Sequence, residues 1–223
     1  MEQYSYINEE IFASQITSEQ LDSLLAGGWR HFGEYFFRYN LGWYQNEIRA
    51  VIPVRLRLTD FSFSKSQRRI LNKNKDLQTV IRPVEITPET ISVFERHKLR
   101  FAENIPDSIY TFLSHEPANV PCEAFEIAVY TKEQLLAKSF FDVGTKSISS
   151  IYGIFAPEET SRSLGILTML LEINFALENG KEFYYHGYIY EGNSFYDYKK
   201  RFRALERFDW KGNWEKFKAQ TLV

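Results

Sequence analysis

The sequence predicts an α+β protein in which a mixed sheet is flanked by helices. Three consecutive segments carry this prediction: a β-branched and aromatic run at Ser147–Phe155, an apolar helix after it, and a second strand at Lys181–Tyr190. Just before them, Ala124–Tyr130 and Gln134–Asp142 have the pattern of a β-hairpin. A strand, helix and strand of this length form a βαβ crossover or its split variant, so parallel and antiparallel pairs are both expected.

The N-terminal segment is expected to hold a short helix and at least one strand. Thr17-Ser18-Glu19, followed by leucines at 21, 24 and 25, is typical of a capped helix that ends at Gly27-Gly28. Trp29–Arg38 mixes apolar and polar residues and is predicted as a strand or edge element. Trp43–Asn46 is predicted as a turn.

A longer strand and two helices follow. Ile48–Leu58 alternates as a strand with two arginines on one face, and Pro53 within it indicates an edge or a break. Ser62–Leu77 is basic and predicts a helix that begins near Ser64 or Ser66, before a boundary at Pro83. Thr87-Pro88-Glu89 is a strong helix start, and we expect that helix to reach about Glu103, with a short helix at Asp107–Ser114.

The central helix is the most apolar of the chain. Thr160 or Ser161 is expected to cap it, with its first turn near Arg162, and Asn179-Gly180 is expected to end it with a left-handed residue. Asp209–Trp214 is predicted as a final turn.

The predicted order of elements is a hairpin followed by a strand, a helix and a strand. This order is found in half of a GNAT-type acyltransferase. A duplicated arrangement of that unit is an open alternative.

Composition narrows the class of protein. The 223 residues are 44% hydrophobic and 25% charged, with a net charge of −2, so the chain is not a globally basic nucleic-acid binder. Cys122 is the only cysteine, which excludes an internal disulfide and a cysteine-based metal site within one chain. Neither a signal peptide nor an apolar run of roughly 20 residues is visible. We therefore expect a cytoplasmic protein without a membrane segment.

Two basic clusters are candidates for contacts with phosphates. Lys65, Arg68, Arg69 and Lys73 would share one face of the predicted basic helix. Lys199–Arg203 carries four cations in five residues after three aromatic rings, a pattern that suits base stacking and phosphate pairing. A solvated helix face and an exposed basic tail are the competing interpretations.

Other polar groups allow more than one interpretation. Glu172 lies on a polar stripe of the apolar helix with Gly165, and a salt bridge to an arginine is favoured over a catalytic role. His186 alternates with tyrosines on the last strand, and a packing histidine with satisfied hydrogen bonds is favoured there. Cys122 is favoured as a thiol without a function. Backbone N–H groups after Ser163 are suited to an anion.

Several motifs in order resemble the arginyl-tRNA–protein transferase family, including its bacterial aspartate/glutamate leucyltransferase branch. The resemblance covers about residues 20–215 and lies in these segments: Gly28-Trp29-Arg30-His31-Phe32-Gly33, Phe63-Ser64-Lys65-Ser66-Gln67-Arg68-Arg69, Ile148-Ser149-Ser150-Ile151-Tyr152, Ser163-Leu164-Gly165 with Glu172-Ile173, Tyr184-Tyr185-His186-Gly187-Tyr188, and Tyr198-Lys199 with Arg201-Phe202-Arg203. The chain departs from the family in three places. Arg38–Val51 lacks the family's metal-binding cysteines, Ala156-Pro157-Glu158 replaces Asp-Pro-Asp, and Asp197 precedes Tyr198-Lys199 where the family has methionine.

The resemblance implies a GNAT-like fold and transfer of an aminoacyl group, of the arginine or leucine type, from aminoacyl-tRNA to a protein with an N-terminal Asp or Glu, as in an N-degron pathway. It implies an N-terminal lobe at 1–83 and a catalytic lobe at 84–223. We expect no cofactor and, because the family's metal-binding cysteines are missing, no metal. The candidate catalytic residues are Tyr188, His186 and Glu172. The candidate substrate- and tRNA-binding residues are Arg30, Lys65, Gln67, Arg68, Arg69, Ser163, Leu164, Gly165, Tyr198, Lys199, Arg201 and Arg203.

Two other functions remain open at this stage. The chain would be a non-catalytic binder of tRNA or of acidic N-termini if the altered motifs abolish catalysis. It would be an acyl-CoA-dependent N-acyltransferase if the strand–helix junction bound CoA, although the glycine-rich turn usual for that ligand is missing at 160–165.

Overall fold

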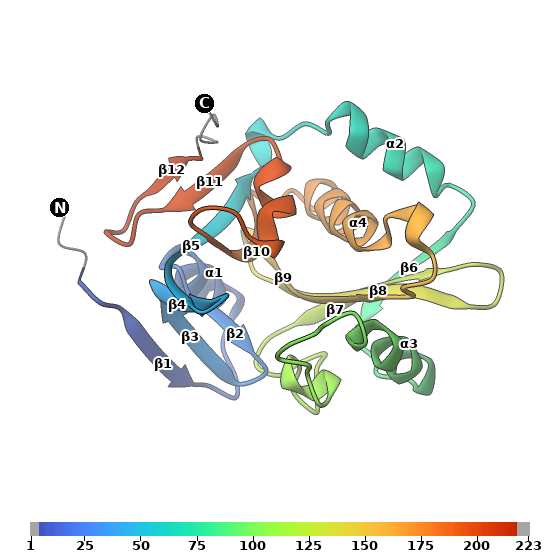
Figure 1. The fold of residues 1–223 in the computed structure, drawn as a ribbon, viewed down its shortest axis with the longest axis horizontal. Coiled ribbons are helices and arrows are strands. Elements are labelled where there is room, and N and C mark those ends of the chain that lie inside the picture. The colour runs from blue at the N-terminus through green and yellow to red at the C-terminus, as the bar shows by residue number, and fades with distance from the viewer. Residues whose placement is uncertain (1–4, 218–223) are drawn as a thin grey trace.

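The computed structural model describes residues 5–217, which form two sheets and four α-helices (Figure 1). The helices are α1 (Ser18–Ala26), α2 (Lys65–Lys73), α3 (Pro88–Lys98) and α4 (Leu164–Glu178). The strands are β1 (Asn8–Phe12), β2 (Arg30–Phe32), β3 (Tyr35–Tyr39), β4 (Leu41–Tyr44), β5 (Glu47–Arg57), β6 (Gln78–Pro83), β7 (Ala124–Tyr130), β8 (Leu135–Val143), β9 (Ser147–Phe155), β10 (Phe183–Tyr190), β11 (Leu205–Phe208) and β12 (Trp214–Lys216). Short 3₁₀ turns are η1 (Leu58–Asp60), η2 (Ile109–Thr111), η3 (Thr160–Arg162) and η4 (Phe195–Arg201).

The larger sheet is mixed, which confirms the predicted α+β class. Its strand order is β12-β11-β5-β10-β9-β8-β7-β6, with β4 paired to β5 beside this path. β9 and β10 pair in parallel and are joined by α4, so the predicted crossover is confirmed. β7 and β8 form the predicted antiparallel hairpin that leads into β9. This series of strands is the GNAT-like arrangement expected from the sequence.

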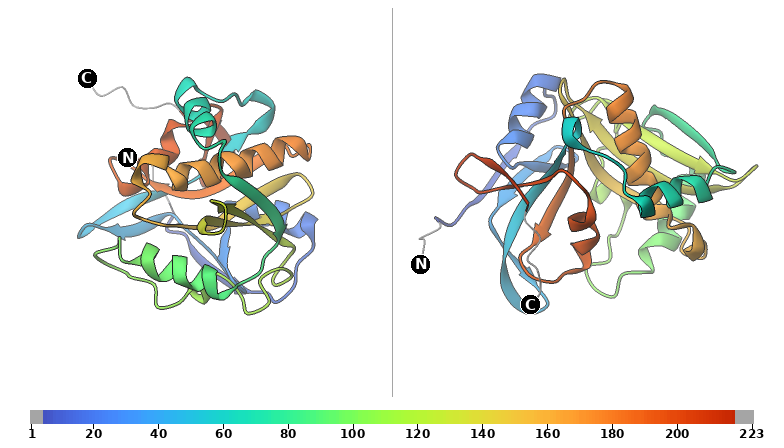
Figure 2. Two further views of the ribbon diagram at one scale, coloured as in Figure 1. Left: turned by 90° about the vertical axis from the view of Figure 1, so that its right-hand side faces the viewer. Right: turned by 90° about the horizontal axis from the view of Figure 1, so that it is seen from above.

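Helices cover both faces of this sheet (Figure 2). α4 packs on one face together with α2, over a core that includes Leu170, Ile173 and Tyr184. α3 packs on the opposite face, over a second core around Phe94 and Phe140. Burial of apolar side chains on both faces stabilises this three-layer arrangement. β5, from the first third of the chain, lies inside the sheet between β10 and β11, and the boundary predicted at 83 falls at the end of β6 and stays a prediction.

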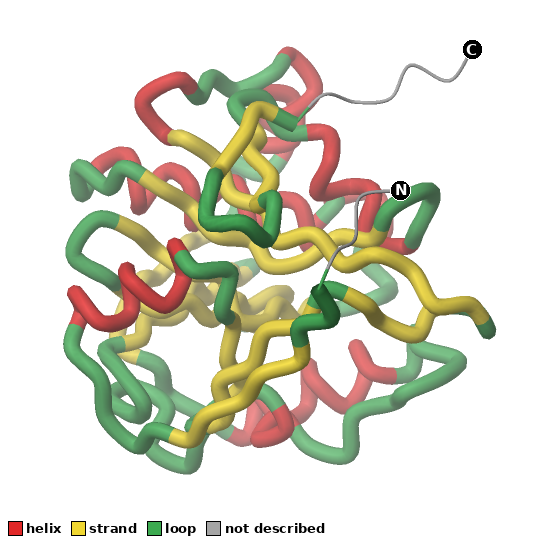
Figure 3. The backbone as a smooth tube through the Cα atoms, turned by 90° about the vertical axis from the view of Figure 1, so that its left-hand side faces the viewer, coloured by secondary structure: helices red, strands yellow, loops and turns green. Residues whose placement is uncertain are grey.

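The N-terminal strands form a separate three-stranded sheet with the order β1-β3-β2, on the side of the molecule seen in Figure 3. The predicted strand at Trp29–Arg38 is two strands, because Gly33 and Glu34 turn the chain back on itself. The turn predicted at Trp43–Asn46 is too early. Trp43 belongs to β4, and the turn lies at Gln45 and Asn46, which both have positive φ.

The strand predicted at Ile48–Leu58 corresponds to β5, and the interruption predicted at Pro53 is confirmed. On one side β5 pairs with β10 over Val51–Arg57. On its other side, β4 pairs as far as Ala50 and β11 pairs from Val54. Pro53 lies in the gap between these two partners, where no neighbouring strand needs the N–H group that proline lacks.

Three helix starts are confirmed with their caps. Thr17, Ser64 and Thr87 each accept a hydrogen bond in a capping box, and Ser64 is therefore the first of the two proposed caps. The expected end of the third helix near Glu103 is wrong, because α3 stops at Lys98 and the chain leaves it through tight turns at residues 99–101. The short helix predicted next is the 3₁₀ turn η2.

The start predicted for α4 is also wrong. Thr160–Arg162 form the 3₁₀ turn η3, and the helix begins at Leu164 after Ser163, which has a left-handed backbone (φ 55°, ψ 45°) and makes no side-chain cap. Contacts with α2 tie down the residues that were expected to open the helix, since Lys73 donates to the Ser161 carbonyl and Asn74 to the Arg162 carbonyl. The predicted end is confirmed at Gly180, where φ is 65°.

The C-terminal segment adds two strands that the sequence did not predict. The expected turn at Asp209–Trp214 is confirmed as the link between β11 and β12. β11 is held on β5 by Glu206, which accepts hydrogen bonds from both Arg55 and Arg57 on one strand face. No helix within residues 5–217 is long and apolar enough to cross a membrane.

Candidate functional site

The two parallel strands at the centre of the large sheet separate after three paired residues. β10 pairs with β9 only over Phe183–Tyr185, opposite Ser147–Ser149. The register of β10 on β5 also shifts between Tyr185 and Gly187. Ser150–Gly153 are only half-buried although β9 is an interior strand. We call the region where the strands part, beyond Ser149 and Tyr185, the β9–β10 splay.

Two cations fill the splay from different parts of the chain. Arg30, on β2, donates from Nη1 to Ser149 Oγ (2.9 Å) and from Nη2 to the Ser150 carbonyl oxygen (2.5 Å). Lys199, on η4, donates from Nζ to the Tyr188 carbonyl oxygen on β10 (3.2 Å). Buried carbonyls need hydrogen-bond partners, and separated strands cannot supply them to each other. Arg30 and Lys199 therefore replace part of the missing strand pairing.

Gly187 allows the two cations to approach each other. A Cβ atom at Gly187 would lie 3.0 Å from Lys199 Nζ and 3.6 Å from Arg30 Cζ, and its φ is 96°. The side chain of Arg30 is 9% exposed and that of Lys199 is half-buried. Burial, and next the charge of Arg30, lower the pKa of Lys199 to about 7. Arg30, with Lys199 beside it, makes the splay a positive site.

Neither Arg30 nor Lys199 forms an ion pair within the described part of the chain. The ion pair next to them on η4 joins Lys200 to Asp197 instead. Burial lowers the pKa of Arg30, and acidic groups such as Asp142 and Glu172 act on it only from further away. Buried charges are normally paired, so this site has the electrostatic character of a binding site for an anion or a polarised carbonyl oxygen.

Glu172 lies beneath the splay on α4 and is fully buried. Its Oε2 atom accepts a 2.7 Å hydrogen bond from the Tyr184 hydroxyl, whereas its Oε1 atom has no partner among the described residues. Burial raises the pKa of Glu172 to about 7. The favoured interpretation of a salt bridge to arginine is therefore wrong for the described contacts, since a tyrosine hydroxyl is its partner.

The other two candidate catalytic residues differ sharply in their hydrogen bonding. His186 is buried against Tyr184 (ring centroids 5.5 Å apart), neither of its ring nitrogens has a partner within residues 5–217, and burial lowers its pKa to about 3. The expectation of a satisfied histidine is therefore wrong. Tyr188 donates its hydroxyl proton to the Gly28 carbonyl (2.7 Å), and burial raises its pKa. A tyrosine in this setting keeps its proton at neutral pH.

The 3₁₀ turn η4 places aromatic rings over the splay. Ser194 caps it, and Phe202 anchors its end in the main core. Lys199 Nζ lies 5.2 Å from the centre of the Tyr196 ring. Burial raises the pKa of Tyr198 to about 12, with Tyr196 and Glu172 contributing. The candidate residues Tyr198 and Lys199 therefore lie in one compact element beside the splay.

The predicted basic face of α2 is confirmed as an exposed surface. Lys65, Arg68, Arg69 and Lys73 are all exposed, whereas Gln67 is buried and its side chain accepts the Ser64 N–H of the capping box. Arg203 donates to Ser62 just before this helix, and Arg201 is exposed in η4. Arg203 of the second cluster thus lies beside the segment that leads into the first, although the two are far apart in sequence.

The start of α4 lies beside the C-terminal end of α2. Arg162, in η3, donates to both carboxylate oxygens of Asp76, which joins the turn after α2 to the turn before this helix. Gly165 lets the helix approach β9, because a Cβ there would lie 2.9 Å from the ring of Phe155. The Leu164 side chain is buried, so only its backbone is suited to a ligand. Ser163 leaves the first N–H groups of the helix without a side-chain cap.

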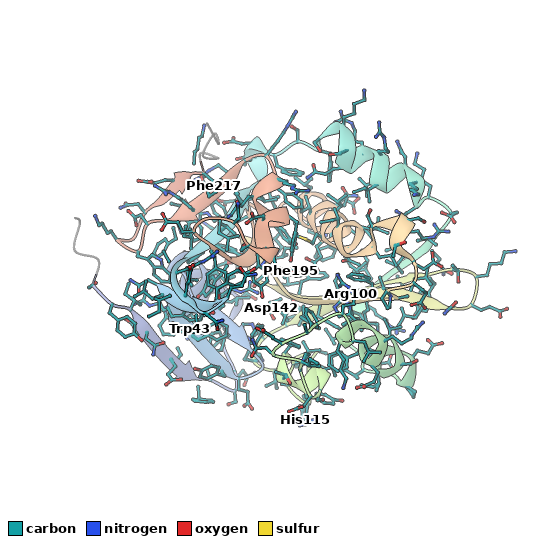
Figure 4. All side chains as sticks on the ribbon, in the orientation of Figure 1. Trp43, Arg100, His115, Asp142, Phe195 and Phe217 are labelled. Carbon is teal, nitrogen blue, oxygen red and sulfur yellow. The ribbon has the colours of Figure 1, made fainter. Side chains whose placement is uncertain are left out.

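A buried polar cluster supports the strand that carries Arg30. His31 Nε2 lies 2.8 Å from Asp142 Oδ2, its Nδ1 lies 2.8 Å from the Gly33 carbonyl, and Cys122 Sγ donates to Asp142 Oδ1 (3.5 Å). Figure 4 labels Asp142 near the centre of the molecule. The possible ligand atoms of His31, Cys122 and Asp142 lie within 4.8 Å of one another. Among the described residues, this is the group that could hold a metal ion. Their mutual hydrogen bonds, and burial that raises the pKa of Cys122, favour a structural role.

Two models of known protein families match this chain. The model described as "Arginine-tRNA-protein transferase, C terminus" matches residues 89–209, and the one described as "Arginine-tRNA-protein transferase, N terminus" matches residues 2–69. Together they cover most of the chain. The chain belongs to the arginine-tRNA-protein transferase family. The motif resemblance found in the sequence is therefore confirmed.

Curated relatives agree with this assignment. The chain is 26% identical to an aspartate/glutamate leucyltransferase of Campylobacter jejuni over 99% of the chain and 89% of the relative. It is 32% identical to an enzyme of the same name from Xanthomonas euvesicatoria over 74% of the chain and 70% of the relative. Among solved structures, L-PGS from Bacillus licheniformis (TM-score 0.49, 14% identity, 82% of this chain and 55% of that one) and FemX (TM-score 0.49, 11% identity, 86% and 65%) are similar.

The sequence does not single out some residues of the site. Ser149 and Ser150 belong to a strand motif, and Gly187 belongs to a tyrosine-rich motif, and neither motif indicates a role for them. Their importance arises from the separation of β9 and β10 after three paired residues, a tertiary feature that no local pattern predicts. Four of the candidate residues come together at the splay: Arg30, Lys199, Tyr198 and Glu172. The exposed cations of α2 form a separate surface.

Proposed function

We propose that this protein transfers a leucyl group from leucyl-tRNA to the α-amine of a protein that begins with Asp or Glu. Membership of the family and the names of the curated relatives support tRNA-dependent aminoacyl transfer and favour leucine over arginine. The observation that carries the proposal is the pair of cations, Arg30 and Lys199, in the β9–β10 splay without an acidic partner.

Arg30 is suited to recognise the acidic side chain of the acceptor. A guanidinium group has five N–H donors, and the hydrogen bonds to Ser149 and Ser150 fix its orientation while leaving donors for a carboxylate. A carboxylate bound there would supply the negative charge that the site lacks. An acceptor with a neutral or basic first residue would leave the buried cation unpaired, which is costly.

The exposed face of α2 is suited to the acceptor arm of tRNA. Its four cations are solvent-accessible, and Arg201 and Arg203 extend the same charge toward the splay. Phosphate contacts of this kind give affinity that falls with salt concentration and carry no base specificity. The rings of Tyr196 and Tyr198 beside the splay are suited to stack on the unpaired 3′ end.

The chemistry requires no nucleophile from the protein. The aminoacyl ester is already activated, so the neutral α-amine of the acceptor attacks its carbonyl carbon directly. The protein holds the two substrates together and stabilises the negative charge that develops on the carbonyl oxygen. Lys199, in the splay, is suited to donate a hydrogen bond to this oxygen. No cofactor is needed for this step.

A transfer assay with a panel of donors tests the proposal. The protein is incubated with leucyl-, phenylalanyl- or arginyl-tRNA and with peptides that begin with Asp, Glu, Asn or Ala. We expect transfer from leucyl-tRNA to the two acidic peptides and little to the others. Tight binding of charged tRNA without transfer would favour a non-catalytic binder, and acylation by acyl-CoA without tRNA would favour an ordinary N-acyltransferase.

A further inference from the structure

The proposed reaction needs a group that removes a proton, since an N-terminal amine is largely an ammonium ion at neutral pH, with an ordinary pKa of about 8. The three residues proposed from the sequence do not fit this task. Tyr188 donates its own proton to Gly28, His186 is a very weak base, and Glu172 lies beneath the splay with its partner Tyr184. Another group must therefore accept the proton.

We propose that Lys199 Nζ accepts the proton that the α-ammonium group of the acceptor loses before it attacks the aminoacyl ester. This role rests on the proposed function. Lys199 is the half-buried amine of the splay, held toward β10 by its hydrogen bond to the Tyr188 carbonyl and kept next to Arg30 by the absence of a side chain at Gly187. In an acidic first residue bound to Arg30, the carboxylate carbon is three bonds (Asp) or four bonds (Glu) from the α-nitrogen, so the α-ammonium group stays close to Arg30 and to its neighbour Lys199.

The surroundings of Lys199 support an uncharged amine. The titratable and charged groups around this pair come from six elements and are Arg30 itself on β2, Tyr39 on β3, Asp142 on β8, Glu172 on α4, Tyr184, His186 and Tyr188 on β10, and Tyr196 on η4. Among them Arg30 is the permanent charge that disfavours a second cation, and burial acts in the same direction. A lysine of this kind exchanges protons near neutral pH, as a general base requires.

Binding of the acceptor would strengthen the base. A carboxylate on Arg30 compensates the positive charge that lowers the pKa of Lys199, so Lys199 becomes more basic once the acidic acceptor is bound. An acceptor with a neutral side chain would not produce this effect. The same two residues would then join recognition of the acidic side chain to activation of the amine.

The proton balance of the step is complete without any further reactant. Lys199 takes one proton from the acceptor ammonium, and the neutral amine forms the C–N bond with the ester carbonyl carbon. The bond between that carbon and the ribose oxygen breaks, and Lys199 returns its proton to the ribose oxygen. The attacking nitrogen loses its second proton to solvent, so the net products are an amide, a free ribose hydroxyl and one proton.

The test compares pH profiles of the single-turnover transfer rate. Lys199→Met should lower the rate at least roughly 100-fold while the protein still binds charged tRNA. Lys199→Cys, alkylated with 2-bromoethylamine, restores an amine of lower intrinsic pKa at this position, and we expect partial recovery with the profile moved to lower pH. Cys122 is buried and its pKa is raised, so the reagent acts on the introduced cysteine. Lys181→Met is the matched control, because Lys181 is also half-buried and donates to backbone carbonyls, those of Gly144 and Thr145, away from the splay, so its loss should leave the rate unchanged.

The outcomes separate the two proposals. An active wild-type protein whose rate and pH profile are unchanged in Lys199→Met, or whose alkylated Lys199→Cys variant keeps the wild-type profile, overturns the role of Lys199 alone. A folded wild-type protein that transfers nothing from any charged tRNA overturns the proposed function, and the role of Lys199 with it. Thermal unfolding of each variant shows that a loss of rate does not reflect loss of the fold.

Discussion

Arg30 Nη1 donates a 2.9 Å hydrogen bond to Ser149 Oγ, which fixes a residue of the N-terminal hairpin at the point where β9 and β10 separate. These two residues are 119 positions apart in the sequence. Through this contact, strand β2 of the N-terminal sheet contributes a residue to the site. It also places a buried cation where the sheet leaves backbone carbonyls without strand partners.

Arg30→Met should abolish the preference for acidic acceptors. Loss of one partner of a buried charge pair costs about 2–5 kcal/mol, so we expect transfer to an Asp peptide to fall roughly 100-fold or more. Transfer to an Asn peptide should change much less. The measurement is kcat/KM for both peptides. Arg38→Met is the control, because Arg38 lies on the neighbouring strand and pairs with Glu9 outside the splay. An unchanged Asp-to-Asn ratio in Arg30→Met would refute this assignment.

Gly187→Ala should impair transfer by displacing Lys199. The new Cβ would meet Lys199 Nζ at 3.0 Å, and a non-glycine residue at φ 96° is strained by about 1–3 kcal/mol. Gly192→Ala is a matched control, with φ 76° and no atom within 4 Å of the added Cβ. Both variants should be destabilised to a similar degree in urea unfolding, whereas only Gly187→Ala should lose activity beyond that. Equal activity of the two variants would contradict the prediction.

Much of the fold was predictable, because local patterns and local contacts agree there. β9 and the β7–β8 hairpin follow from β-branched and aromatic runs between clear breaks, and the three capping boxes follow from short polar motifs. The start of α4 was not predictable, since Lys73 and Asn74 on another helix hold Ser161 and Arg162 outside it. The site was only partly predictable for the same reason. Motifs identify Arg30 and Lys199 separately, and only the tertiary contacts of Arg30 with β9 and of Lys199 with β10 bring them together.

Lys65→Ala combined with Arg69→Ala should weaken tRNA binding in a salt-dependent way. Each lost phosphate contact reduces the slope of log K against log salt by about 0.7–0.9, so the double variant should lose about 1.5. Binding of the acceptor peptide should not change. Lys132→Ala with Lys146→Ala is the control, because these exposed lysines lie in the turns at the two ends of β8. The same slope in both double variants would exclude the α2 face as the tRNA surface.

Glu172→Gln should change how stability depends on pH. The folded protein holds a proton on Glu172 up to about pH 7, whereas the unfolded chain releases it near 4.5. Rising pH across this window therefore destabilises the wild type, by about 3 kcal/mol in total. Glutamine cannot titrate, so the variant should gain stability relative to the wild type between pH 5 and pH 8. His186 and other titrating groups are common to both proteins and cancel in the difference. A pH-independent difference in the free energy of unfolding would contradict the placement of Glu172.

The central claim is that the β9–β10 splay joins a charged tRNA to an acidic N-terminus. It is tested most directly by the mass and N-terminal sequence of a peptide that begins with Asp, after incubation with the wild-type protein and leucyl-tRNA. The account predicts one leucyl residue added at the N-terminus, no addition when the peptide is N-acetylated, and addition slowed roughly 100-fold or more when Arg30 is replaced by methionine. An unmodified peptide, under conditions in which the Campylobacter jejuni leucyltransferase modifies it, would contradict the account.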